Sequence, residues 1–96
     1  MQIWLDDIRP VPDGFIWVHN LAELKTLLTG NQEAIEVMSF DNDLGDGEPE
    51  GYDIIKWLAD AHLDRWPQEI RVHSQNPVGA NNIRQFADFI QRRVLV

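Results

Sequence analysis

Apolar side chains occur in four short runs along the chain, each bounded by polar or turn-forming residues. The first three runs are mostly apolar, whereas the fourth alternates Ile70 and Val72 with Arg71 and His73. Runs of this length and composition are typical of β-strands, and alternation is typical of a half-exposed strand. The sequence therefore predicts four strands, at residues 3–5, 15–18, 35–40 and 69–74.

Apolar residues between these runs recur at helical spacing. One helix is predicted after Asn20, which can cap it with Glu23 in the capping-box position, and it ends at Gly30. A second helix is predicted over about residues 52–63. A third begins at Asn76-Pro77, a capping residue followed by proline at the first helical position.

The order of elements, β-loop-β-α-β-α-β-α, predicts one α/β domain over residues 1–96 with a mostly parallel sheet. The first connection, residues 6–14, is short, because a parallel crossover usually needs about a dozen residues or more. Either this segment crosses without a regular helix, or the first two strands are antiparallel.

Composition places the chain among globular proteins, with 44% hydrophobic and 25% charged residues. No apolar run approaches the roughly 18 residues of a membrane span, and the N-terminus lacks the basic segment of a signal peptide. The sequence has no cysteine, which excludes disulfides and thiolate metal sites. We therefore expect a cytoplasmic protein that makes no contact with a membrane.

The net charge is −8, from sixteen acidic and eight basic residues. So acidic a chain is not expected to bind duplex DNA, which requires a basic surface. A small phosphate-containing ligand or an RNA end remains a candidate if a metal ion masks the acids. A protein partner is a further candidate.

Polar residues follow three of the predicted strands. The three groups are Asp6-Asp7, Asp41-Asn42-Asp43, and His73-Ser74 with Asn76. Ligands of open parallel sheets bind beyond the carboxyl ends of the strands, so we expect these groups to share one crevice. Converging carboxylates repel one another unless a cation lies between them, and oxygen ligands suit Mg²⁺.

Other interpretations of these residues remain open. Asp46 stands where a calcium-binding loop needs its glycine, so the acidic segment after the third strand is not such a loop. Asn76 is most simply a helix cap, which is compatible with an anion site at the same helix start. His73 points away from Ser74 on an alternating strand, so it either enters the crevice or packs elsewhere.

Four segments of the chain carry a resemblance to a known family: residues 5–10 (LDDIRP), 39–45 (SFDNDLG), 51–58 (GYDIIKWL) and 72–79 (VHSQNPVG). The double Asp after the first strand and the single Asp after the third resemble response-regulator receiver domains. Over about residues 3–85 the chain resembles more closely the cyclic-phosphate-processing receiver family. That resemblance implies a flavodoxin-like or receiver-like α/β fold with four strands in the order 2-1-3-4. We expect it to form a three-layer sandwich with the last strand at an edge.

The resemblance also implies roles for individual residues. Mg²⁺ (or Mn²⁺) is expected on Asp6, Asp7 and Asp41. The expected catalytic residues are Asp41, His73 and Asp43, and the expected substrate-binding residues are Arg9, Asn42, Ser74 and Asn76. The chain departs from ordinary receivers in a nearly deleted first helix and in stopping before their fifth strand. It departs from the cyclic-phosphate-processing family in Asn42, where that family commonly has His.

Three functional hypotheses follow. The first is a metal-dependent phosphoesterase that opens cyclic phosphates, either 2′,3′-cyclic RNA ends or cyclic nucleotides. In it Asp41 is a metal ligand or a nucleophile, and His73 or Asp43 is the general acid or base. The second is a non-catalytic acidic binding module, for example a phage-type inhibitor that blocks a protein or sequesters a cyclic nucleotide. The third is an atypical phosphoacceptor.

Overall fold

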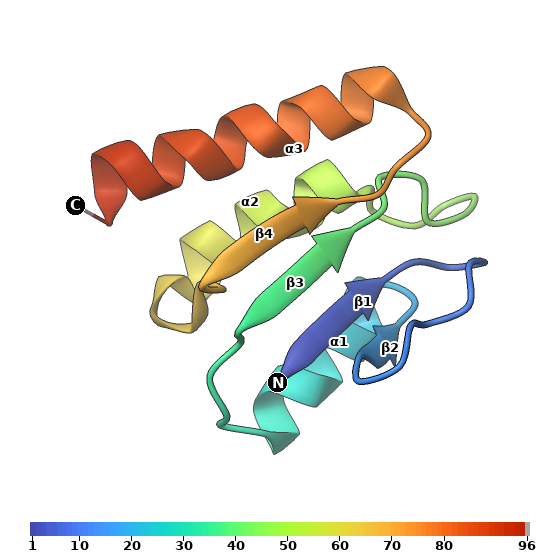
Figure 1. Ribbon diagram of the computed structural model, residues 1–96, viewed down its shortest axis with the longest axis horizontal. Coiled ribbons are helices and arrows are strands. Elements are labelled where there is room, and N and C mark those ends of the chain that lie inside the picture. The colour runs from blue at the N-terminus through green and yellow to red at the C-terminus, as the bar shows by residue number, and fades with distance from the viewer. Residues whose placement is uncertain (96) are drawn as a thin grey trace.

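Four parallel strands form a single sheet in the order β2-β1-β3-β4 (Figure 1). The computed structural model describes residues 1–95. The central strand β1 pairs with both β2 and β3, and β3 pairs with β4. The predicted strand order and receiver-like α/β fold are therefore confirmed. The strands are β1 (Gln2–Leu5), β2 (Ile16–Val18), β3 (Val37–Phe40) and β4 (Glu69–Val72).

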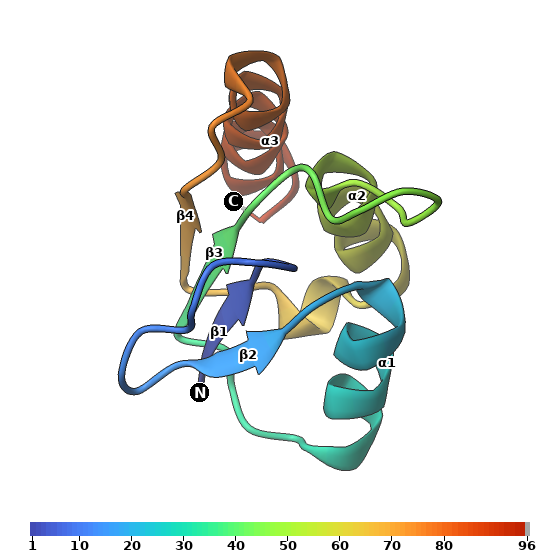
Figure 2. The same ribbon diagram turned by 90° about the vertical axis from the view of Figure 1, so that its right-hand side faces the viewer.

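The connection from β1 to β2 crosses without a helix, and it bulges away from the helices (Figure 2). Two indoles hold it. Trp17 Nε1 donates to the Asp6 carbonyl at 2.6 Å, and Trp4 Nε1 donates to the Arg9 carbonyl at 3.3 Å. Gly14 supplies a positive φ of 84° just before β2. The short connection thus joins parallel strands as an irregular segment.

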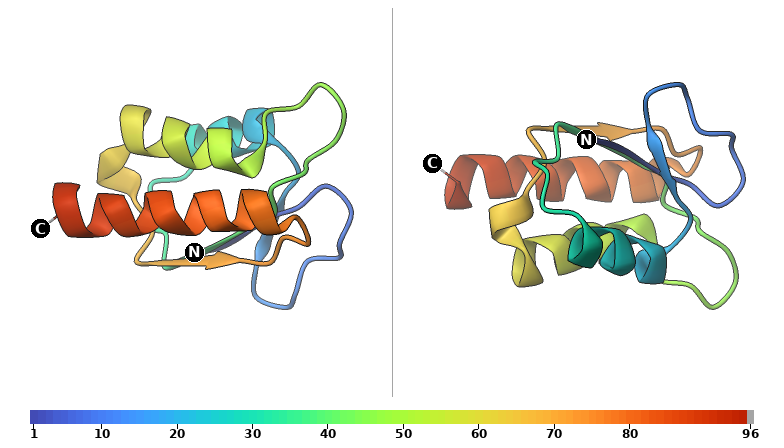
Figure 3. Two further views of the ribbon diagram at one scale, coloured as in Figure 1. Left: turned by 90° about the horizontal axis from the view of Figure 1, so that it is seen from above. Right: turned by 90° about the horizontal axis from the view of Figure 1, so that it is seen from below.

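Three helices pack on one face of the sheet: α1 (Leu21–Gly30), α2 (Gly51–Ala61) and α3 (Pro77–Phe89) (Figure 3). A 3₁₀ turn, η1 (Leu63–Arg65), follows α2, and a π-helical turn, η2 (Ile90–Val94), follows α3. None of the helices within residues 1–95 is both long and apolar enough to cross a membrane.

The core lies between the sheet and these helices. Ile3 and Leu5 on β1 are fully buried against it, whereas Trp4 between them faces the opposite side and is half-buried. One cluster of buried side chains joins the strands β1 and β3 to the helices α1 and α2, and it also includes Ile83 of α3. The predicted three-layer sandwich is therefore wrong. The first connection contains no helix, and within residues 1–95 no later helix returns to that face, so the sandwich has two layers.

Two glycines bring the helix starts close to the end of β3. A Cβ at Gly51 would overlap the Asp41 carbonyl oxygen, and a Cβ at Gly79 would overlap the side chain of Asn42. Asn76 caps α3 as predicted, since its Oδ1 accepts a hydrogen bond from the Gly79 amide at 3.1 Å. The first turns of α2 and α3 consequently lie beside the carboxyl edge of the sheet.

Candidate metal centre

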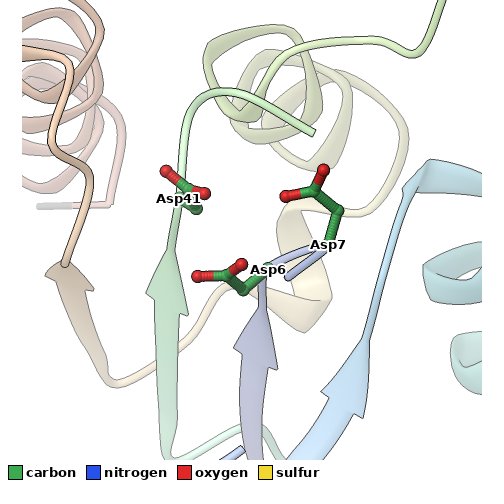
Figure 4. A group of neighbouring side chains, drawn as sticks. All are labelled: Asp6, Asp7 and Asp41. Atoms are coloured by element: carbon green, nitrogen blue, oxygen red, sulfur yellow. The ribbon is translucent and has the colours of Figure 1, made fainter. Parts of the chain in front are cut away.

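Three carboxylates meet at the carboxyl edge of the sheet (Figure 4). Asp6 and Asp7 follow β1, and Asp41 follows β3, the strand beside it. Leu5 and Phe40 are paired in register, and the Asp41 amide donates to the Leu5 carbonyl at 2.9 Å. One oxygen from each carboxylate lies within 4.8 Å of the other two. Parallel pairing in this register is what places the three acids together.

Asp6 is fully buried, and each of its carboxylate oxygens is engaged. Oδ1 accepts hydrogen bonds from the amides of Ile8, at 2.8 Å, and Arg9, at 2.9 Å. Oδ2 accepts from His73 Nε2 at 3.0 Å. Such donors stabilise a buried carboxylate and fix its orientation toward the other two acids.

The charged form of Asp41 is disfavoured in the absence of a cation. Burial raises its pKa above the ordinary value, and the negative charge of Asp6 raises it further. Hydrogen bonds from Ser74 and from the Asn42 amide, the latter at 2.8 Å, oppose this rise. A cation bound among the carboxylates would favour the charged form of Asp41. Three hard oxygen donors on adjacent strand ends could hold a hard divalent cation such as Mg²⁺ or Mn²⁺.

An open pocket of about 450 Å³ lies over the three acids. Arg9 brings a positive side chain to its wall, and the same guanidinium donates to the His73 carbonyl. A divalent cation held by the acids would, together with this guanidinium, suit a phosphate group. The residues lining the pocket are Asp6, Asp7, Ile8, Arg9, Asp41, Asp43, Gly45 and Gln75.

His73 lies behind Asp6, on the helix-free side of the sheet, and is not part of the pocket lining. Its ring stacks on Trp4 with centroids 3.7 Å apart, and its Nδ1 lies 2.7 Å from Ser39 Oγ. Burial lowers the pKa of His73, although the Asp6 carboxylate partly opposes this. Burial thus favours the neutral imidazole, which has one donor nitrogen and one acceptor nitrogen. The side chain of His73 reaches the site through Asp6, and its carbonyl accepts from Arg9.

Asn42, expected to bind substrate, points away from the pocket. It is 1% exposed, and its Oδ1 accepts from the Tyr52 amide at 3.1 Å. Its Nδ2 lies 3.4 Å from Glu50 Oε2. The substrate-binding role predicted for Asn42 is therefore wrong, because the start of α2 uses the side chain as a cap and α3 packs against it.

Ser74 and Asn76 do not line the pocket themselves, but each contacts an acid that does. Ser74 Oγ accepts from the Asn76 amide at 3.1 Å, and Ser74 also contacts Asp41. Asn76 Nδ2 lies 3.4 Å from both carboxylate oxygens of Asp43, which lines the pocket. These contacts link the start of α3 to the acidic segment after β3. Gln75, which no sequence pattern pointed to, lines the pocket as well.

Sequence reasoning also missed the residues on the helix-free face that contact the site, Ser39, Trp4 and Trp17. The signal that marks them is strand alternation. Trp4 lies between the core residues of β1, and Ser39 lies opposite Trp4 in the β1–β3 register. Both side chains must therefore face away from the core, on the side where Asp6 and His73 meet.

The family model described as "Cyclic-phosphate processing Receiver domain" matches residues 1–89 of the chain. No curated protein and no solved structure matches the chain.

Proposed function

This chain belongs to the family of cyclic-phosphate processing receiver domains, and on that premise we propose that it is a metal-dependent phosphoesterase. Its substrate class is a cyclic phosphate, either the 2′,3′-cyclic end of an RNA or a cyclic nucleotide. The observation that carries the proposal is the meeting of three carboxylates with Arg9 in one open pocket. The carboxylates supply ligands for a metal ion, and the guanidinium supplies a positive group that binds a phosphate beside that ion.

Asp6, Asp7 and Asp41 hold the cation, which is Mg²⁺ or Mn²⁺. When bound, it offsets the acid cluster and draws electron density from a phosphoryl oxygen. Arg9 binds a second phosphate oxygen and orients the ring for attack. Ile8, which is 78% exposed on the pocket wall, leaves this side of the site open to the nucleoside.

Hydrolysis opens the ring by water attack on phosphorus. A new P–O bond forms to water, one ester P–O bond breaks, and a proton passes from water to the leaving oxygen. Asp43 lines the pocket with an exposed carboxylate and is the acid or base that this transfer uses. The same pocket admits Asp41 as a nucleophile. Its carboxylate oxygen would then bond to phosphorus as one ring P–O bond breaks and the freed oxygen takes a proton, and water would cleave the resulting aspartyl ester to release the phosphomonoester.

The test is incubation with a panel of cyclic nucleotides and a 2′,3′-cyclic-phosphate oligoribonucleotide, with Mg²⁺ or with EDTA. We expect a phosphomonoester product, detected by chromatography, only when Mg²⁺ is present. Asp7→Asn should abolish it, and Asp46→Asn should not. Asp46 lies in the same acidic segment but outside the pocket lining, so it is a matched control for net charge.

Each alternative predicts a different result in the same experiment. A nucleotide that binds without forming product indicates sequestration. A stable phosphoryl group on the protein indicates a phosphoacceptor. If Asp7→Asn and Asp46→Asn weaken function equally, the acidic surface acts by its charge, as a protein-blocking module would.

A further inference from the structure

A line of three polar side chains crosses the helix-free face of the sheet and ends on a metal ligand. Ser39 Oγ lies 2.7 Å from His73 Nδ1, and His73 Nε2 lies 3.0 Å from Asp6 Oδ2. The carboxylate of Asp6 only accepts hydrogen bonds, so Nε2 must carry the proton. In the neutral ring Nδ1 then accepts from the Ser39 hydroxyl. The direction of the hydrogen bond to Asp6 is thereby fixed.

Packing holds the imidazole in this position. Trp4 covers one face of the ring, with an angle of 4° between the two planes. Ser39 is 3% exposed, and the His73 carbonyl accepts from the Arg9 guanidinium. With both ring nitrogens engaged and one face covered, His73 has little freedom to turn toward the pocket.

We propose that Ser39, His73 and Trp4 form a support that orients the Asp6 carboxylate toward the metal, with His73 a positioning residue for that ligand. The proposal rests on the metal site of the proposed function, but it reassigns His73 from acid or base. Hydrogen bonds that orient a ligating side chain from behind typically change metal affinity by about 10- to 100-fold when they are removed. Asp6 has no freedom to find another donor, because its other oxygen is already held by the Ile8 and Arg9 amides.

The experiment is a titration of the metal-free protein with Mn²⁺, with free Mn²⁺ measured by electron paramagnetic resonance. His73→Leu removes the donor to Asp6 and should weaken Mn²⁺ binding by roughly 10- to 100-fold. His73→Gln should restore most of the affinity, because its amide nitrogen can reach Asp6 although it cannot exchange a proton near neutral pH. Ser39→Ala, which leaves Nδ1 without its donor, should weaken binding in the same direction by a smaller factor.

The chain offers a matched control in His19. This histidine stacks on Trp17 of the same sheet, with centroids 4.5 Å apart, but its Nδ1 bonds Glu23 at 2.7 Å and it contacts no metal ligand. His19→Leu removes the same kind of stacked imidazole and should leave the Mn²⁺ affinity unchanged. Unfolding in urea without metal shows separately how much each variant has lost in stability.

The outcomes separate this proposal from the proposed function. Equal Mn²⁺ affinity in His73→Leu and the unchanged protein overturns the support, and so does an equal loss in His73→Gln and His73→Leu. If His73→Leu does not fold, Ser39→Ala decides, and an unchanged affinity there overturns the support as well. Mn²⁺ binding with the expected variant pattern but no hydrolysis of any cyclic phosphate upholds the support and refutes the enzyme. A protein that binds no Mn²⁺ at all overturns both.

Discussion

The substitution Asp41→Asn should stabilise the metal-free protein while it removes the response to metal. Asparagine has the same shape and keeps the oxygen that accepts from the Asn42 amide. The change therefore removes a negative charge and little else. The charge it removes lies within 4.8 Å of carboxylate oxygens on Asp6 and Asp7.

The gain follows from Coulomb repulsion. Two unit charges at that separation repel by roughly 0.9 kcal/mol in water and by roughly 3.5 kcal/mol at an effective dielectric constant of about 20. Asp41 is partly exposed, so the solvent-screened end of this range applies, and we expect a gain of about 1 kcal/mol. For a domain of this size that corresponds to an increase in Tm of roughly 4–8 °C.

The gain should depend on pH with a definite sign. Burial and the charge of Asp6 raise the pKa of folded Asp41 above its ordinary value of 3.8. Protonated Asp41 thus adds stability that is complete below pH 3.8 and is lost as the pH rises through the raised pKa. Asparagine does not titrate, so the advantage of the variant should grow over this interval and persist at pH 7. The lowered pKa of His73 acts in both proteins and largely cancels in the difference.

Differential scanning calorimetry of both proteins, in EDTA and in excess Mg²⁺ at pH 4 and pH 7, checks this reasoning. At 100 times its Kd a ligand stabilises the folded state by about 2.7 kcal/mol, so Mg²⁺ should make the unchanged protein the more stable of the two. A variant that melts below the unchanged protein at pH 7 in EDTA would refute the repulsion argument. Equal stabilisation of both proteins by Mg²⁺ would show that Asp41 is not a ligand.

Asp7→Asn should remove most of the Mg²⁺-dependent increase in Tm, whereas Asp46→Asn, in the acidic segment outside the pocket, should keep it; thermal melts with and without Mg²⁺ compare the two. Gly79→Ala should lower the free energy of unfolding in urea by about 1–3 kcal/mol, because its Cβ has no room beside Asn42. Asn42→Ala should cost about 1–3 kcal/mol by leaving the buried cap of α2 unmade, and in combination with Gly79→Ala the loss should be smaller than the sum. Fully additive losses would contradict the overlap between the two side chains.

The strand order was predictable because local patterns and topology agree in this chain. Apolar runs separated by helical spacing specify alternating strands and helices, and Asn20 and Asn76 mark two helix starts by their side chains. The number of layers was not predictable in the same way. It depends on whether a segment of about nine residues forms a helix, and two indole hydrogen bonds decide that it does not.

The position of the acids was predictable, but the direction of their neighbours was not. Asp6 and Asp41 end adjacent parallel strands, so their meeting follows from topology alone. Asn42 comes one residue later, yet its direction depends on how closely α2 and α3 approach β3, which Gly51 and Gly79 set. The side-chain partners of His73 lie on β3, on β1 and in the connection after β1, so their meeting depends on how the strands pair and not on their spacing along the chain.

The two indoles that fasten the first connection give this protein an optical property. Trp4 and Trp17 donate hydrogen bonds to the backbone that carries Asp6 and Arg9, and Trp4 is stacked on His73. Any rearrangement of that backbone changes the polarity around both fluorophores and the contact with a neighbouring ring. The other two tryptophans, Trp57 and Trp66, lie outside this segment and contribute a steady background. The intrinsic fluorescence of the unlabelled chain should therefore follow events at the acidic pocket in real time.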